Sequence, residues 1–377
     1  MPKLLLAPQK VSPLPANNMF GWRVAQVAVW LLGAAILYCL LFVSALGLTL
    51  FWDVLIPVAP AVLVLAPGLW RNICPLATTI LLPRHAGLSK RKRLSVKQLG
   101  RLNLMGVAAL YVIVPLRHAL FNNNGPATGL LIIGLATVGI ATGFVYEWKS
   151  AWCAGLCPVH PVEKLYGGNT HVPLPNAHCG KCANCVIPCP DSTPNIHPKT
   201  GNKSIYHTIG GWAVVGGLPG FIWGWFQVPD AEKITTLGAF MGVYKMPALG
   251  FAITLALYAI VRGIVKEQHT RKLISVFGAA AVSCYYWYRI PALLGFGQQG
   301  YDGLLVNLRN TLPGWSMPAI TTATTAFFFY WLVVRKPTNT SWLARPAFAT
   351  KQQMAAGKQA GQRLKQVDST ASGIVRL

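Results

Sequence analysis

The stretch from Leu130 to Tyr146 reads LLIIGLATVGIATGFVY and carries no charged residue. A run of this length and apolarity predicts a helix that crosses the hydrocarbon core of a bilayer. The composition of the whole chain agrees, because 53% of its 377 residues are hydrophobic and only 11% are charged. An average soluble domain carries about 25% charged residues. The sequence therefore predicts an all-α polytopic membrane protein.

Apolar stretches near the length of a membrane span recur on both sides of this one. About eight spans are expected, at Val24–Leu48, Val54–Trp70, Leu104–Phe121, Leu130–Tyr146, Ile205–Phe226, Met246–Val265, Leu273–Leu294 and Pro318–Val334. The second is short and contains three prolines, which interrupt helices. Four spans are thus expected in residues 1–147 and four in 204–335. An insert, 148–203, separates the two halves, and a tail, 336–377, follows them.

The basic residues orient the chain. The formal net charge is +24, and Lys and Arg gather in the loop 84–101, around 262–272 and in the tail. By the positive-inside rule these segments are cytoplasmic. The prediction is a multi-pass protein of a prokaryotic inner membrane with both termini and the insert in the cytoplasm. Asp53 and Asp230 fall in the opposite loops. The basic residues are explained by membrane lipid, so nucleic acid is not an expected partner.

The insert contains a dense run of cysteines. Cys179, Cys182, Cys185 and Cys189 are spaced C-x2-C-x2-C-x3-C-P, which is the bacterial ferredoxin pattern for a [4Fe–4S] cluster. Structural zinc sites generally use separated cysteine pairs, and disulfides do not suit a reducing compartment. The run predicts one cluster in a small, loop-rich, ferredoxin-like insert that carries electrons.

A second pair of cysteines lies at the start of the insert, where Cys153 and Cys157 stand in WCAGLCPVHP. From Trp148 to Ser192 the chain resembles the NapH-like ferredoxin-type membrane proteins, which include quinol-oxidising accessory subunits of periplasmic nitrate reduction. The resemblance implies that Cys157 ligates a neighbouring cluster and that Cys153 is its partner. Members often carry two complete ferredoxin runs, whereas this chain has one. The fourth ligand of the cluster stays open between Cys189 and Cys157.

A second cluster would need ligands from elsewhere. Cys74 is a candidate, because it too is followed by proline and is expected on the cytoplasmic face, although a buried packing cysteine is the simpler interpretation. His160 and His178 are alternative ligands, with ordinary loop histidines as the simpler interpretation. Cys39 and Cys284 lie within apolar spans and are expected to pack there.

The spans contain few polar groups that could serve a redox cofactor. His118 and His207 are expected near opposite faces of the membrane, which disfavours a haem between them. Polar side chains such as those of Arg117, His118 and Arg289 cost free energy when they are placed in hydrocarbon. They are interpreted either as a quinone or proton site or as interfacial anchors whose long side chains reach the headgroups.

These features predict an integral membrane iron–sulfur protein that passes electrons between a cytoplasmic-side [4Fe–4S] cluster and quinol, quinone or a redox partner subunit. One cluster is expected, and two are an open alternative. The rival hypothesis is a maturation factor that reduces a metal or cofactor for another membrane enzyme. With 9 acidic residues in the whole chain and no acid–base constellation, no catalytic residue is assigned. The chain is expected to be an electron-transfer component of an oxidoreductase system rather than a stand-alone enzyme.

Overall fold

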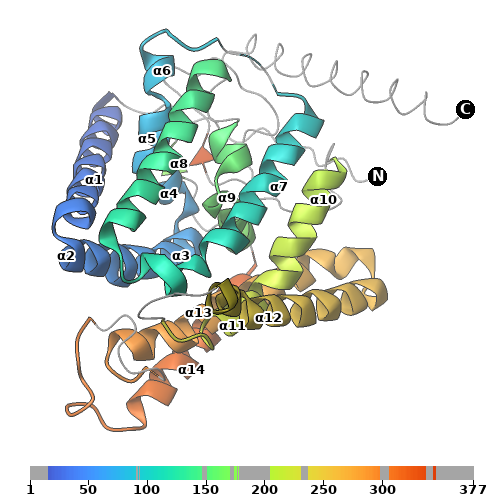
Figure 1. Cartoon of the computed structure of the whole chain (residues 1–377). Coiled ribbons are helices and arrows are strands. Elements are labelled where there is room, and N and C mark those ends of the chain that lie inside the picture. The colour runs from blue at the N-terminus through green and yellow to red at the C-terminus, as the bar shows by residue number, and fades with distance from the viewer. Residues whose placement is uncertain are drawn as a thin grey trace, which may run out of the picture.

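The computed structural model describes residues 16–90, 92, 94–146, 151–169, 174–175, 177, 204–230, 237–297, 305–336 and 343–344. This part of the chain is mostly helical (Figure 1). A short parallel pair joins β1 (Leu174–Pro175) to β2 (Leu343–Ala344). The ferredoxin run, His178 and the tail beyond Lys336, apart from β2, lie outside the described residues.

Five helical stretches are long and apolar enough to cross a membrane, which confirms the prediction of a helical membrane protein. They are Phe20–Phe42, Ser44–Leu65, Gly125–Val145, Phe240–Ile264 and Ser316–Val334. Four of them overlap one predicted span each, Ser44–Leu65 overlaps the first and the second, and the count of eight stays a prediction. In Figure 1, the axes of α1 and α8 are roughly aligned, and the axis of α12 lies across them. The candidate spans therefore do not form a single parallel bundle.

The N-terminal part is a series of helices broken at prolines. Its elements are α1 (Ala16–Phe42), α2 (Ser44–Leu48), the π-helical turn η1 (Thr49–Leu55), α3 (Ile56–Leu65), α4 (Pro67–Ile73), α5 (Pro75–Ile80) and α6 (Leu82–His85). The predicted second span, Val54–Trp70, is wrong in its limits, because the helix breaks at Ala66 before Pro67. Asp53 lies within η1 rather than in a loop, where Arg289 Nη2 contacts its Oδ1 at 2.6 Å.

The middle of the chain carries the segments that later form the site. Its elements are α7 (Val96–Ile113), η2 (Arg117–Phe121), α8 (Gly125–Val145), η3 (Trp152–Leu156), α9 (Val159–Tyr166) and η4 (Gly167–Asn169). A capping box of Ser95 and Gln98 starts α7 inside the predicted basic loop. Although α9 lies in the predicted insert, its Leu165 and Tyr166 are buried in the main hydrophobic core.

The C-terminal part begins with two short helices and continues with long ones. Its elements are α10 (Ile205–Trp212), η6 (Ala213–Gly217), α11 (Leu218–Trp225), α12 (Leu237–Ile264), η7 (Glu267–His269), α13 (Thr270–Leu293), α14 (Ser316–Phe329) and η8 (Tyr330–Val334). Helices α11 and α12 touch closely at Gly220 and Gly250, where a Cβ on Gly220 would lie 2.0 Å from the Gly250 carbonyl oxygen. Small residues allow such backbone contact between apolar helices.

A tyrosine from α13 stabilises the proline-containing helix α3. The Tyr286 hydroxyl donates to the Pro57 carbonyl oxygen at 2.6 Å and accepts from the Ala61 N–H at 2.9 Å. These two backbone groups would bond to each other in a regular helix. Tyr286 is also 8% exposed. The hydroxyl thus ties α13 to α3.

Tyr286→Phe is expected to lower the free energy of unfolding by about 1–3 kcal/mol, because it leaves two buried backbone groups without this partner. The measurement is detergent-solubilised thermal unfolding. Tyr38→Phe is the matched control, because Tyr38 is 60% exposed on α1. Equal melting temperatures for the two variants would contradict this role of the hydroxyl.

Candidate functional site

Three cysteines from two separate segments line one small cavity. Cys74, Cys153 and Cys157 share it with Trp70, Trp152 and other side chains, and its volume is about 30 Å³. A cavity of this size has room for water. Cys153 is buried, and the other two are partly buried. The structure thus brings together the pair Cys153 and Cys157, predicted as ligands, and Cys74, for which packing was the simpler interpretation.

The two Cys-Pro sequences make the same kind of joint between helices. Cys74 ends α4 with φ −53° and ψ 117°, and Pro75 begins α5. Cys157 ends η3 with φ −63° and ψ 118°, and Pro158 precedes α9. Proline disfavours the helical conformation in the residue before it, which explains why both cysteines are extended. Both breaks adjoin the cavity.

Glycines allow the segment with Cys153 to approach its neighbours. A Cβ on Gly106 of α7 would lie 2.7 Å from the Gly155 carbonyl oxygen and 3.0 Å from that of Leu156. A Cβ on Gly139 of α8 would meet the Trp152 ring at 3.3 Å. Because η3 is held between α7 and α8 at these points, the position of Cys153 depends on both glycines.

Burial keeps the Cys157 thiol protonated when no metal is bound. The pKa of Cys157 is raised to about 12, first by burial and then by the nearby Cys74 thiol, against the opposing effect of backbone N–H groups of His160 and Val159. A thiol with this pKa is neutral at pH 7. A metal that binds here must therefore displace the proton, as it does at thiolate sites generally.

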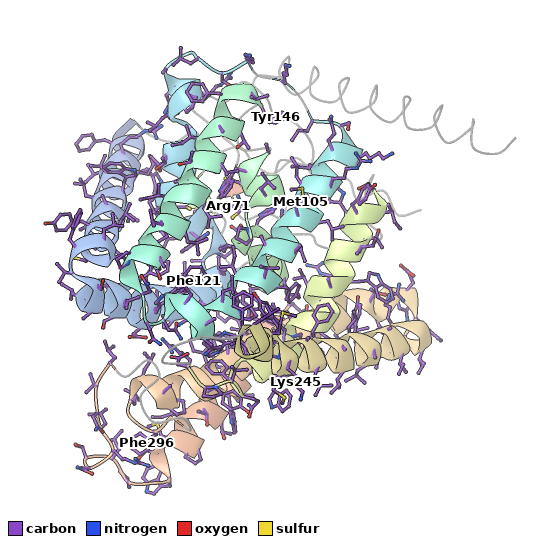
Figure 2. The ribbon with its side chains drawn as sticks, in the orientation of Figure 1. Arg71, Met105, Phe121, Tyr146, Lys245 and Phe296 are labelled. Atoms are coloured by element: carbon purple, nitrogen blue, oxygen red, sulfur yellow. The ribbon has the colours of Figure 1, made fainter. Side chains whose placement is uncertain are left out.

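A buried ion pair forms another part of the cavity lining. Arg71, labelled in the interior of the molecule in Figure 2, contacts Glu163 with 2.7 Å between Nε and Oε1. Their side chains are 5% and 3% exposed. The sequence alone did not predict this pair. The available signal was a charged residue near each Cys-Pro, Arg71 three residues before Cys74 and Glu163 six residues after Cys157.

His160 is held by the same pair. Its Nδ1 contacts Arg71 Nη2 and lies 3.2 Å from Glu163 Oε2. Burial, and then the charges of Arg71 and Lys164, lower the pKa of His160 well below its ordinary value. A guanidinium can only donate and a carboxylate can only accept, so Nδ1 accepts from Arg71 in the neutral ring and faces Glu163 as a donor only in the other tautomer. His160 as a ligand stays an open alternative.

The chain that leads into the ferredoxin run is attached beside the cavity. The Ala177 N–H donates to Asn72 Oδ1 at 3.0 Å, and Gln26 Nε2 donates to the Asn72 carbonyl oxygen at 2.8 Å. Ala177 and Asn72 are both 0% exposed. Ala177 precedes Cys179 by two residues, as Asn72 precedes Cys74. Ala177 is therefore attached to α4, next to the joint that contains Cys74.

The three thiols at the cavity are not arranged as a site for a single ion. Among the described residues, no group of three Cys, His, Asp or Glu side chains is arranged to hold one metal ion. The thiolates around a cubane bind different iron atoms, so they need not converge on one point. Cys179, Cys182, Cys185 and Cys189 lie outside the described residues.

A second polar cluster contains the three basic residues singled out within the spans. His118 Nδ1 lies 2.5 Å from Asp230 Oδ1, and its Nε2 lies 3.0 Å from the Trp225 carbonyl oxygen. The Arg117 guanidinium stacks 3.9 Å above the Trp52 ring. Arg117, His118 and Arg289 are 5%, 1% and 1% exposed. Interfacial anchoring is therefore wrong for these residues, because they are enclosed by protein. The quinone or proton site stays a prediction.

The remaining predicted positions lie apart from the cavity. Cys39 and Cys284 are partly buried and are not among the residues that line it. His207 is near the start of α10, where its Nδ1 lies 3.1 Å from the Ser204 hydroxyl. No protein family, curated protein or solved structure matches the chain. The function is therefore argued from the cysteines and their surroundings.

Proposed function

We propose that this protein is an integral membrane iron–sulfur protein that passes single electrons between a [4Fe–4S] cluster and quinol, quinone or a redox partner subunit. The observation that carries the proposal is the meeting of Cys74, Cys153 and Cys157 at one buried cavity. Ala177, two residues before the ferredoxin run, is attached beside it. Iron–sulfur ligation explains why thiols from separate segments gather there.

The residues of the run would hold the cluster. Cys179, Cys182 and Cys185 supply three thiolates, and Cys189 or Cys157 supplies the fourth, as the ferredoxin spacing allows. When bound, such a cluster accepts and releases one electron. At the cavity, the buried Trp152 and the partly buried Trp70 limit the access of water.

The membrane part determines where the electron is delivered. The five candidate spans support an integral membrane protein. We extend this to about eight spans, with the insert on the cytoplasmic face of a prokaryotic inner membrane, on the basis of the positive-inside rule. The resemblance to NapH-like proteins supports quinol as the donor. Membrane lipid and a redox partner are accordingly the proposed partners.

The first test is the metal content of the unaltered chain, purified without oxygen. We expect iron and acid-labile sulfide in equal amounts and a [4Fe–4S] EPR signal after reduction with dithionite. Cys182→Ser is expected to remove about four irons per chain, because it deletes a ligand from the ferredoxin run. Cys39→Ser is the matched control. Stoichiometric zinc without iron would overturn the proposal.

A further inference from the structure

We infer that the C-terminal tail is a structural part of the insert, and that its strand β2 holds the lead-in to the ferredoxin run, which is Leu174, Pro175 and Ala177. This inference rests on the proposed function and adds to it a positioning role for the far end of the chain. The sequence predicts for this tail only a cytoplasmic location next to membrane lipid. The contacts that carry the inference belong to the described residues of the insert, of η8 and of β2.

The lead-in is too short to be a stable strand by itself. Leu174 lies between Pro173 and Pro175, and a residue before proline is kept extended. Proline has no N–H to donate, so a strand that contains it can form few ladder hydrogen bonds. An isolated pair of strands is marginal in water. Strand β1 therefore depends on the segments that contact it.

One of these segments is the tail. Strand β2 is parallel to β1, with Leu174 opposite Leu343 and Pro175 opposite Ala344. The two strands are far apart in the sequence, so their pairing is a tertiary contact. Pairing between strands uses backbone groups, which every residue other than proline carries in full. The composition of the tail therefore gives no sign of this contact.

The lead-in is also attached to two helices. The Ala177 N–H donates to Asn72 Oδ1 of α4 at 3.0 Å, and Arg23 Nη2 of α1 donates to the Ala177 carbonyl oxygen at 3.3 Å. Arg23 is held in turn by Gln26, with 2.6 Å between Nη1 and Oε1. Helix α4 contacts β1 as well. The tail strand and these helices together hold the lead-in.

The tail leaves the membrane part at a fixed point beside the insert. η8 contacts η4, the turn that follows α9. Trp331 Nε1 donates to the Val64 carbonyl oxygen at 3.3 Å, and the Arg335 guanidinium lies 3.7 Å from the centre of the Trp331 ring. Residues 337–342 then connect to β2, over a distance of at most about 25 Å. Insert and tail thus meet at two places, η4 with η8 and β1 with β2.

A fixed lead-in favours the binding of a cluster by the run. In small metal domains, the free energy of metal binding also has to order the chain around the metal. Ordering each residue costs conformational entropy. Where the lead-in is already held by β2 and Asn72, less of this entropy is lost when the cysteines of the run bind iron. Loss of β2 should therefore weaken iron binding while the membrane helices stay folded.

The test compares two full-length variants purified without oxygen. Leu343→Pro with Ala344→Pro removes both N–H groups of β2, whereas Leu343→Val with Ala344→Val keeps them in residues that favour strands. The proline variant should lose about half or more of its iron and of the EPR signal of the reduced cluster. The valine variant should lose neither. Both leave the charge of the tail unchanged, so its attraction to anionic lipid is the same in the two.

Hydrogen exchange gives a readout that does not depend on iron. In the metal-free chain, the amide groups of the lead-in should exchange about tenfold faster in the proline variant than in the valine variant, because local opening becomes easier without β2. The amide groups of α8 should exchange equally in both variants. This comparison separates the loss of one contact from a general loss of stability.

The outcomes separate the inference from the proposed function. If the proline variant keeps both its iron and its slow exchange, β2 does not hold the lead-in, and the proposed function stands. Equal loss of iron in the two variants would also overturn the inference, because pairing would not be the cause. If the unaltered chain contains no iron, the proposed function fails, and the exchange of the lead-in still tests the contact.

The unaltered chain provides the measurement if neither variant folds. Slow exchange at the Leu343 or Ala344 amide in the metal-free chain supports the pairing of β2 with β1. Rapid exchange at both amides would overturn it.

Discussion

Glu163→Gln is expected to destabilise the folded chain by about 3–5 kcal/mol, because it leaves the charge of Arg71 uncompensated in the interior. The two side chains are almost fully buried and 2.7 Å apart. Removing one partner of a buried ion pair lowers the free energy of unfolding by more than the intact pair raises it. The remaining charge has lost both its partner and the water that solvates it in the unfolded chain. The measurement is the unfolding free energy of the purified, metal-free chain in detergent.

A matched pair elsewhere in the chain provides the control. Arg262 and Glu267 lie 3.1 Å apart, but the Glu267 side chain is 58% exposed. Glu267→Gln should therefore cost no more than about 1 kcal/mol. Equal effects at Glu163 and Glu267 would contradict the assignment of a buried pair.

A double variant tests the cause of the loss. Arg71→Met combined with Glu163→Leu removes both charges and fills similar volume, so most of the stability lost in Glu163→Gln should return. If the double variant is as unstable as Glu163→Gln, packing around His160 rather than the unpaired charge is responsible. Its iron content in the anaerobic protein shows separately whether the ion pair matters to metal binding.

Gly106→Ala is expected to destabilise the chain by about 1–3 kcal/mol, the usual cost of overpacking. The added methyl group would lie 2.7 Å from the Gly155 carbonyl oxygen and 3.0 Å from that of Leu156. Both atoms belong to the backbone, so η3 must shift. That shift displaces Cys153 and Cys157 relative to Cys74.

The control for this substitution is Gly134→Ala in α8. A Cβ on Gly134 meets nothing within 4 Å, and Ala in a helix interior is favoured over Gly by about 0.5–1 kcal/mol. The control should therefore melt no lower than the unaltered chain. A melting temperature for Gly106→Ala equal to that of the control would contradict the close contact of α7 with η3.

The helical membrane class and the helix breaks at Cys74 and Cys157 could be predicted because local chemistry determines them. An apolar stretch such as Leu130–Tyr146 favours a membrane helix wherever it stands in the chain. The prolines after Cys74 and Cys157 break their helices by contacts with the preceding residue alone. Such effects act over a few residues, so the sequence determines them.

The composition of the cavity was decided by tertiary structure. The proline after Cys74 made that residue a candidate, but its meeting with Cys153 depends on how α4 packs near η3 and on the glycine of α7 that lets η3 approach. The burial of Arg117, His118 and Arg289 has the same origin. A periodic pattern shows that a residue lies in a helix, but its partners come from other segments. Basic groups within the spans are therefore paired with a distant carboxylate or carbonyl. The sequence by itself thus determined the helical membrane class, and only long-range packing decided which thiols and charges share one cavity.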